Sequence, residues 1–329
     1  MEGTETANVT ASGMGAITSV LLQLCEAGNH IISSRTIYGG TYAFLKNFTP
    51  RFNIETSFVD ITNLDAVEAT ITENTKVIYC ESVSNPLLEV ADIEGLAAIA
   101  KKHNLKLVVD NTFSPLSISP AKLGADVVVH SLTKFINGSS DTVGGVVCGT
   151  QEFINDLRNV NDGACMLLGS TMDSLRASSI LKNLRTLHIR MQQHSFNASY
   201  LAEKFEDLGL KTVYPGLNSH SSHNLFKSMM NEKYGFGGML TIDVGSLEKA
   251  NELMEMMQKE NLGYLAVSLG FYKTLFSAPG SSTSSEIPED EQKEMGLTDG
   301  LIRFSIGLDA DIERTFKIMK FCMEKLNII

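Results

Sequence analysis

The sequence contains no tryptophan, and it has only five cysteines and seven prolines among 329 residues. The cysteines are scattered without Cys-x-x-Cys spacing, so neither a metal site nor a disulfide framework is expected. No apolar run approaches the roughly 20 residues that span a bilayer, and no stretch has the layout of a signal peptide. We therefore expect no membrane partner and predict a cytoplasmic protein.

Basic residues are fewer than acidic residues in this sequence. Lysine and arginine number 27 against 38 aspartates and glutamates, for a formal net charge of −11. Nucleic acids and anionic membranes require a basic surface to displace counterions, so neither is an expected partner. A small molecule or another protein is expected instead.

Hydrophobic residues make up 43% of the chain and charged residues 20%, which is typical of a globular protein with a large core. Apolar segments of strand length alternate with helical stretches up to about residue 150, and this alternation predicts an α/β fold with a mainly parallel sheet. Segments 107–109 and 127–129 are apolar without alternation, as in central strands covered on both faces. The predicted strands are His30–Ser34, Glu55–Asp60, Val77–Glu81, Lys106–Asp110, Asp126–Ser131 and Gly144–Gly149.

The second half of the chain has a different pattern. One long helix is predicted from residue 175 to about residue 210. A strand, a helix, a Gly/Ser-rich loop and a final helix are predicted after it, at Gly238–Val244, Leu247–Lys259, Ser277–Ser285 and from Asp311 onward. These elements predict a smaller C-terminal α+β domain of residues 186–329 behind an α/β domain of residues 1–185.

Polar residues follow the predicted strands at the edge where open parallel sheets bind ligands. Asp110 ends a central strand, and a carboxylate buried there is costly unless it meets a cation. Lys134 follows the next strand at the same edge, with Ser131 and Thr133 beside it. A protonated pyridine nitrogen would supply the cation, and the lysine could condense with the aldehyde of pyridoxal phosphate. The alternatives are a turn aspartate and a solvated lysine.

The first predicted helix opens with small residues. Ser12, Gly13 and Met14 could present free backbone N–H groups to a phosphate, and the helix dipole would favour its charge. The alternative is an ordinary capped helix start. The order of a phosphate loop, a strand-end acid and Ser-x-Thr-Lys favours a pyridoxal-phosphate site.

Three segments carry a resemblance to a known family: Glu-Ser-Val-Ser-Asn-Pro at 81–86, Val-Asp-Asn-Thr-Phe at 109–113 and His-Ser-Leu-Thr-Lys at 130–134. They resemble signatures of the γ-family of sulfur-amino-acid pyridoxal-phosphate enzymes, and the resemblance extends over essentially the whole chain. It implies an aspartate-aminotransferase-like fold of type I and a homo-oligomer built as a dimer of dimers.

The resemblance also implies roles for individual residues. Tyr38 is similar to the tyrosine that stacks on the cofactor ring and acts as an acid toward the leaving group. Asn85 is similar to the asparagine bonded to the ring hydroxyl, and Arg303 to the arginine that holds the substrate carboxylate. Ser268 lies in a segment similar to one that lines the substrate site. The alternatives are turn residues at 38 and 85 and a surface arginine at 303.

The implied reaction is α,γ-elimination from a sulfur amino acid, with Lys134 removing the α-proton. Val267 stands where cystathionine γ-lyases carry a glutamate, and an apolar position suits the thioether of methionine, which would yield methanethiol, 2-oxobutyrate and ammonia. Gly40 stands where many bacterial methionine γ-lyases carry a cysteine. Cystathionine lysis and γ-replacement by an O-acetylhomoserine sulfhydrylase or a cystathionine γ-synthase therefore stay open.

Family members carry a Tyr-x-Arg motif before the stretch similar to residues 2–5, and this motif clamps the cofactor phosphate of a neighbouring subunit. The present sequence starts after that motif. An inactive truncated paralogue is thus the alternative from another class. A nicotinamide dehydrogenase is disfavoured because no Gly-x-Gly-x-x-Gly follows a predicted strand.

Overall fold

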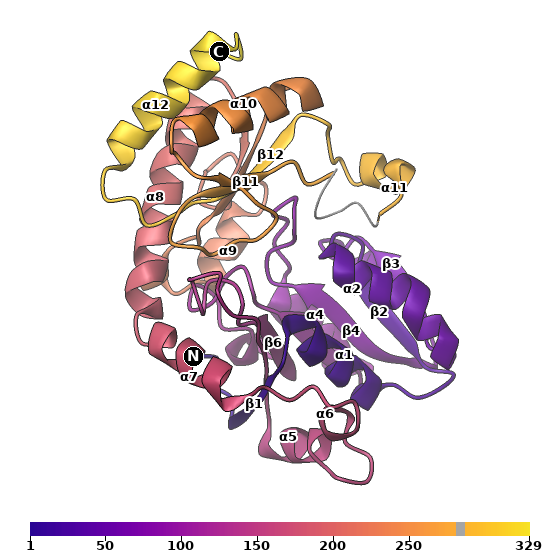
Figure 1. Cartoon of the computed structure of the whole chain (residues 1–329). Coiled ribbons are helices and arrows are strands. Elements are labelled where there is room, and N and C mark those ends of the chain that lie inside the picture. Colours follow the sequence, from indigo (N-terminus) through magenta and orange to yellow (C-terminus); the bar gives the residue numbers. More distant parts are fainter. Residues whose placement is uncertain (281–286) are drawn as a thin grey trace.

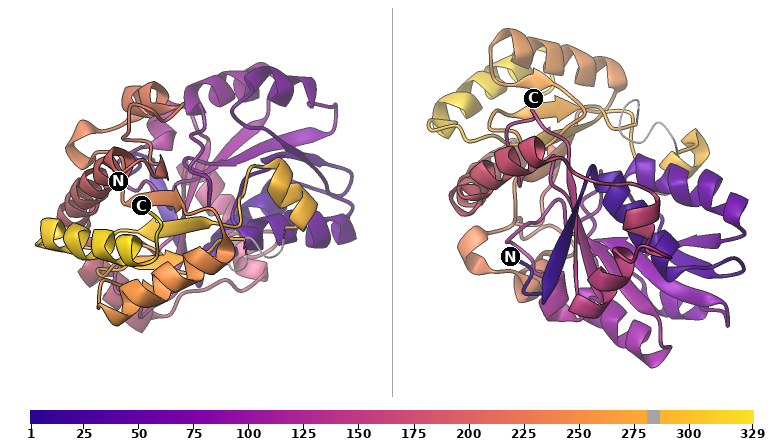
Figure 2. Two further views of the ribbon diagram at one scale, coloured as in Figure 1. Left: turned by 90° about the horizontal axis from the view of Figure 1, so that it is seen from above. Right: turned by 60° about the horizontal axis from the view of Figure 1, so that its bottom comes forward.

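The computed structural model describes residues 1–280 and 287–329, and it contains two β-sheets with helices packed around them (Figure 1). The predicted loop 277–285 lies mostly outside the described residues, and Ser277 belongs to a strand. Figure 2 shows that the two sheets belong to two adjoining halves of the molecule. In the described part of the chain, no helix is both long and apolar enough to cross a membrane.

The larger sheet has seven strands in the order β1-β7-β6-β5-β4-β2-β3. Strands β2 to β6 pair in parallel, whereas β7 is antiparallel to both β6 and β1. The mainly parallel sheet predicted from the sequence is therefore confirmed. Its strands are β1 (Thr6–Thr10), β2 (His30–Ser34), β3 (Glu55–Val59), β4 (Thr75–Glu81), β5 (Lys106–Asp110), β6 (Val127–Ser131) and β7 (Gly145–Gly149).

Helices cover both faces of this sheet, because its strands carry apolar side chains on both. Helix α1 packs Ile17 and Val20 against the face that carries Val108, and α4 packs Leu96 against the face that carries Val109. The helices of this half are α1 (Gly13–Leu24), α2 (Gly39–Ala43), α3 (Leu64–Ala69), α4 (Ile93–Lys102), α5 (Gln151–Leu157), α6 (Ala164–Leu167) and α7 (Ser174–Leu184). Short π and 3₁₀ turns lie at η1 (Phe44–Phe48), η2 (Thr49–Phe52) and η3 (Pro120–Leu123).

The smaller sheet has five strands in the order β10-β11-β12-β9-β8. Helices α8, α10 and α12 bury Phe205, Leu253 and Met319 against its apolar side chains. Its strands are β8 (Lys211–Val213), β9 (Met239–Asp243), β10 (Tyr264–Leu265), β11 (Leu275–Ser277) and β12 (Leu301–Ser305). The remaining helices are α8 (Leu187–Asp207), α9 (His223–Met229), η4 (Glu232–Tyr234), α10 (Leu247–Lys259), α11 (Glu289–Glu294) and α12 (Ile312–Lys325).

The single long helix predicted from residue 175 is wrong, since the chain forms two helices, α7 and α8, with a break at 185–186. The hydroxyl of Thr186 donates to the carbonyl of Asn183 at 3.0 Å and accepts from Nε of Arg190 at 3.1 Å. Such local side-chain bonds compete with the helical ladder. The predicted domain boundary at residue 185 coincides with this break, and independent folding of the two parts stays a prediction.

Leu253→Ala should lower the free energy of unfolding by about 2–5 kcal/mol, because it leaves a cavity in the second core. Leu253 is fully buried on α10, whereas Leu247 on the same helix is 40% exposed. Urea unfolding followed by circular dichroism measures the loss, and Leu247→Ala is the matched control, expected to cost under about 1 kcal/mol. Equal losses in the two variants would contradict the packing described for α10.

Candidate active site

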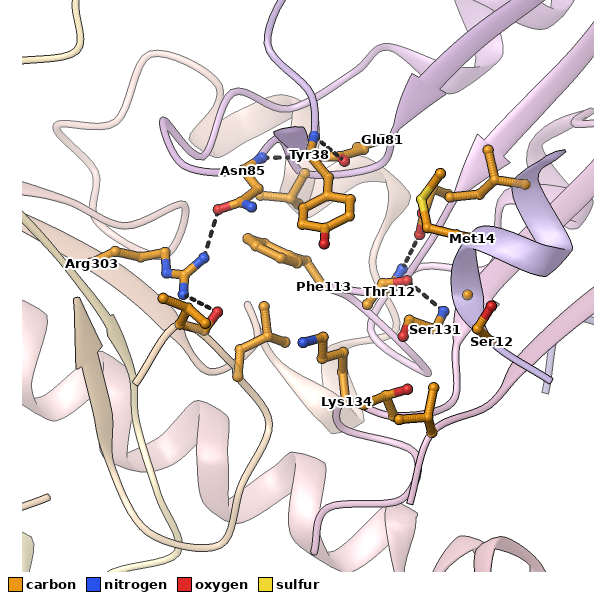
Figure 3. Close-up of a pocket in the computed structure, with 18 residues that line it drawn as sticks. Ser12, Met14, Tyr38, Glu81, Asn85, Thr112, Phe113, Ser131, Lys134 and Arg303 are labelled. Carbon is orange, nitrogen blue, oxygen red and sulfur yellow. Dashed lines mark hydrogen bonds between the residues drawn. The ribbon is translucent and has the colours of Figure 1, made fainter. Parts of the chain in front are cut away.

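A cavity of about 240 Å³ lies at the carboxyl edge of the larger sheet, where that sheet faces the smaller half (Figure 3). The structure brings ten of the predicted site residues to its wall: Ser12, Gly13, Met14, Tyr38, Asn85, Asp110, Ser131, Thr133, Lys134 and Arg303. Ser268, the remaining one, is not part of the wall but contacts the lysine from the adjoining loop. Residues from both halves of the molecule thus surround one space.

Asp110 ends β5 and is 8% exposed. Its Oδ1 accepts the backbone N–H of Thr112 at 2.9 Å. Burial raises the pKa of this carboxyl, while the Thr112 bonds and nearby His130 oppose the rise. Among the described residues no cation forms an ion pair with Asp110. A buried acid of this kind suits a protonated ring nitrogen.

Lys134 lies in the turn after β6 and points into the cavity (Figure 3). Its Nζ donates to the hydroxyl of Ser268 at 3.1 Å. Burial, and then the positive charge of Arg303, lower the pKa of Lys134 to about 8. A larger fraction of the amine is therefore uncharged near neutral pH than in a free lysine side chain, as a nucleophile or a base requires.

Helix α8 anchors the segment that follows this lysine. Arg190 donates to the carbonyls of Phe135 and Ile136, the latter at 2.8 Å. One turn along, Nδ1 of His194 donates to the carbonyl of Ile306 at 2.6 Å, and its ring meets Phe135 edge-on. The same face of α8 therefore holds both the lysine turn and the chain directly after β12.

The amino end of α1 forms another wall. Ser12 is the N-cap and accepts the N–H of Gly15 at 2.9 Å. A Cβ on Gly13 would lie 2.8 Å from Cβ of Ser131, so only glycine allows the helix start to approach β6 this closely. First-turn amides together with the hydroxyls of Ser131 and Thr133 form a donor set that suits a phosphate.

Arg303 on β12 is only 2% exposed. Its Nη1 donates to Oδ1 of Asn85 at 2.8 Å, and Nη2 donates to the carbonyls of Val267 at 3.1 Å and Ser268 at 3.3 Å. Among the described residues its buried Nε has no partner, and no carboxylate pairs with the guanidinium. Burial lowers the pKa of Arg303 to about 10. A buried cation with an unused donor suits an anionic ligand.

Tyr38 is the residue before α2 and is 43% exposed, with its ring over the cavity (Figure 3). A Cβ on Gly40 would lie 2.6 Å from Cε1 of that ring, so the glycine leaves the tyrosine room. Asn85 is bonded to Arg303 through its amide oxygen. The roles of both residues toward the cofactor ring stay predictions.

Several lining residues were not predicted from the sequence: Val83, Phe113, Val143 and Leu269 add apolar surface, and Glu81 and Thr112 add polar groups. Glu81 could have been found, because it ends β4 and pairs in register with Asp110 on β5. The strand-end argument that selected Asp110 applies equally to Glu81.

In protein freed of cofactor, labelling of Lys134 by acetic anhydride should show a midpoint at about pH 8, because burial and Arg303 disfavour the charged amine. Arg303→Leu should move this midpoint upward by removing the positive charge. Peptide mass spectrometry at several pH values measures the labelling, with exposed Lys101 as the internal control. A midpoint for Lys134 near that of free lysine would contradict the lowered pKa.

Comparison with known proteins identifies the family. The family model described as Cys/Met metabolism PLP-dependent enzyme matches residues 1–317. A methionine γ-lyase of Arabidopsis thaliana is 49% identical over 317 residues, which cover 95% of this chain and 72% of that protein. An L-methionine γ-lyase of Fusobacterium nucleatum subsp. polymorphum is 38% identical, over 95% of this chain and 80% of that protein.

The fold agrees with that family. A crystal structure of cystathionine γ-lyase from Lactobacillus plantarum complexed with L-serine superposes with a TM-score of 0.90 at 30% identity, covering 99% of this chain and 84% of that one. The predicted fold of type I and the predicted pyridoxal-phosphate cofactor are therefore confirmed. The chain belongs to the family of pyridoxal-phosphate-dependent enzymes of cysteine and methionine metabolism.

Proposed function

We propose that the chain catalyses α,γ-elimination of L-methionine to methanethiol, 2-oxobutyrate and ammonia. The observation that carries this proposal is one cavity that joins a partly buried amine, a buried acid and a buried guanidinium, from Lys134, Asp110 and Arg303. The likeness to proteins named methionine γ-lyase supports the choice of substrate.

Pyridoxal phosphate fits the cavity by the chemistry of its walls. Asp110 would hold the ring nitrogen, while Ser12, Gly13, Met14, Ser131 and Thr133 would hold the phosphate. When bound, the cofactor withdraws electrons from the substrate α-carbon. The chain supplies the remaining groups for binding and proton transfer.

Arg303 holds the substrate carboxylate, since its Nε is an unused buried donor among the described residues. Lys134 takes the α-proton at Nζ, and Ser268 orients that amine through its hydroxyl. Tyr38 donates a proton to the leaving sulfur from its hydroxyl. Proton transfer by a positioned side chain contributes about 100- to 10,000-fold to a rate.

The apolar side chains on the wall, Val83, Phe113, Val143, Val267 and Leu269, favour the thioether of methionine over a charged tail. The second candidate is γ-replacement. Two residues at the opening of the cavity favour it: Tyr38 is 43% exposed and Val267 is 60% exposed. An open entrance of this kind admits an external thiol. Replacement and elimination share their first proton transfers. In replacement an external thiol then adds at the γ-carbon, whereas in elimination the remaining carbon chain is released and water converts it to 2-oxobutyrate and ammonia.

We further propose that the chain assembles into a homo-oligomer, as a dimer of dimers, and acts in the cytoplasm. Large apolar side chains are exposed on α6, α7 and α8: Met166, Leu167, Leu175, Leu181, Ile189 and Phe196. Surfaces of this kind are typical of protein interfaces. A second copy of the chain would cover them.

Tyr38→Phe should lower kcat for methionine by about 100- to 10,000-fold with little change in KM, because the ring stays and only the proton donor is lost. Release of 2-oxobutyrate measures the rate. Tyr272→Phe, which removes a hydroxyl outside the cavity wall, is the control. An unchanged kcat in Tyr38→Phe would remove the tyrosine from the reaction.

Purified protein with pyridoxal phosphate should be yellow, and borohydride should bleach it. Lys134→Ala should abolish the colour that survives gel filtration, and Lys101→Ala should not. In matched assays, the amount of 2-oxobutyrate released from methionine should exceed the amount of homocysteine formed from O-acetylhomoserine and sulfide. The reverse ratio of the two products would favour γ-replacement. A colourless wild-type protein would contradict the proposal that the chain acts with pyridoxal phosphate.

A further inference from the structure

Glu81 is a buried acid to which the proposed reaction assigns no role. It ends β4, is 7% exposed and forms part of the cavity wall. Its Oε1 accepts the backbone N–H of Tyr38 at 2.8 Å, and its Oε2 accepts the backbone N–H of Asn85 at 2.8 Å. Figure 3 shows the carboxylate joined to both backbones. Each oxygen of one side chain therefore holds a different loop.

These two loops carry side chains of the proposed site. Tyr38 is the N-cap residue of α2. Asn85 links Glu81 to Arg303, since its Oδ1 accepts a hydrogen bond from Nη1 of Arg303 at 2.8 Å. A continuous chain of bonds thus runs from Tyr38 through Glu81 and Asn85 to Arg303.

The position is electrostatically costly. Glu81 lies beside Asp110 in the parallel register, and no described cation pairs with it. Burial, and then the charge of Asp110, raise the pKa of Glu81 to about 8, while the two backbone bonds oppose the rise. An apolar residue would avoid this cost. What the carboxylate adds is two acceptors that face two donors.

We propose that Glu81 is a positioning residue whose carboxyl group fixes Tyr38 and Asn85 at their relative positions across the cavity. Through Asn85 it also sets the place of the Arg303 guanidinium. This role rests on the proposed function, which places Tyr38 over the leaving group and Arg303 on the substrate carboxylate.

The number of hydrogen-bond acceptors on the side chain at position 81 distinguishes a positioning role from a role in packing alone. A glutamine offers one acceptor oxygen to the two amides, and a leucine offers none. Glu81→Gln should therefore free one amide, and Glu81→Leu should free both. Asp126→Asn is the matched control, because it makes the same chemical change at an acid outside the cavity wall, which accepts the backbone N–H of Leu107 and neither of these two amides.

The test is hydrogen–deuterium exchange of the full chain with pyridoxal phosphate added, read on peptides that contain Tyr38 and Asn85. Loss of its hydrogen bond should speed exchange of the freed amide by about two- to tenfold. We expect faster exchange at one site in Glu81→Gln, at both in Glu81→Leu and at neither in Asp126→Asn. Unchanged exchange at both sites in Glu81→Leu would overturn the proposal, and thermal unfolding establishes that each variant is folded.

Kinetics supply the second readout. Glu81→Leu should lower kcat for methionine and raise KM, because Tyr38 and Arg303 are both displaced, whereas Tyr38→Phe should affect mainly kcat. If Glu81→Leu changes neither constant, the positioning role is rejected. Should the wild type fail to act on methionine, the proposed function fails, and amide exchange still decides whether the carboxylate fixes the two loops.

Discussion

Two carboxyl groups, Glu81 and Asp110, stand side by side at the buried end of the larger sheet, and the site depends on how each is compensated. The parallel register of β4 and β5 places them together. Neither can stay charged in a low-dielectric interior without partners. Glu81 uses two backbone amides, whereas Asp110 accepts from one amide and faces the cavity. Because their hydrogen bonds differ, Glu81 is suited to hold the main chain and Asp110 is suited to bind a cationic group of a ligand.

The positive charges of the site come from elsewhere in the chain. Lys134 follows β6, and Arg303 comes from β12 of the smaller sheet. Arg303 is buried and Lys134 partly so, and burial lowers the pKa of both. Two acids and two basic groups therefore surround one cavity, although they lie on four separate segments. This arrangement requires both halves of the molecule to be in place.

The sequence predicted much of this arrangement because the strand-end argument needs only local information. The central strands are continuous apolar segments, so the sequence alone assigns Asp110 and Lys134 to one edge of the sheet. Strand β1 was missed, because Thr6–Thr10 is short and largely polar and becomes a strand by pairing with β7. The break at 185–186 was missed as well, since it depends on side-chain bonds that periodicity does not report.

The contacts between the site residues were harder to predict than which residues belong to the site. Asn85 was assigned to the cofactor ring by resemblance, but its bond to Arg303 joins residues far apart in the sequence. The strand-end argument would have selected Glu81, but its contacts could not be predicted, because its partners are backbone amides and every residue type except proline carries an amide N–H. Hydrogen bonds to the main chain leave no trace in composition or spacing.

Helix α8 gives the two basic groups a common reference. Arg190 grips the carbonyls that follow Lys134, and one turn later His194 grips the chain that follows β12. The rise of a helix is fixed at about 1.5 Å per residue, so the spacing between these two grips is set by the helix itself. Helix α8 therefore fixes the distance between two segments, one that directly follows Lys134 and one that directly follows the strand carrying Arg303.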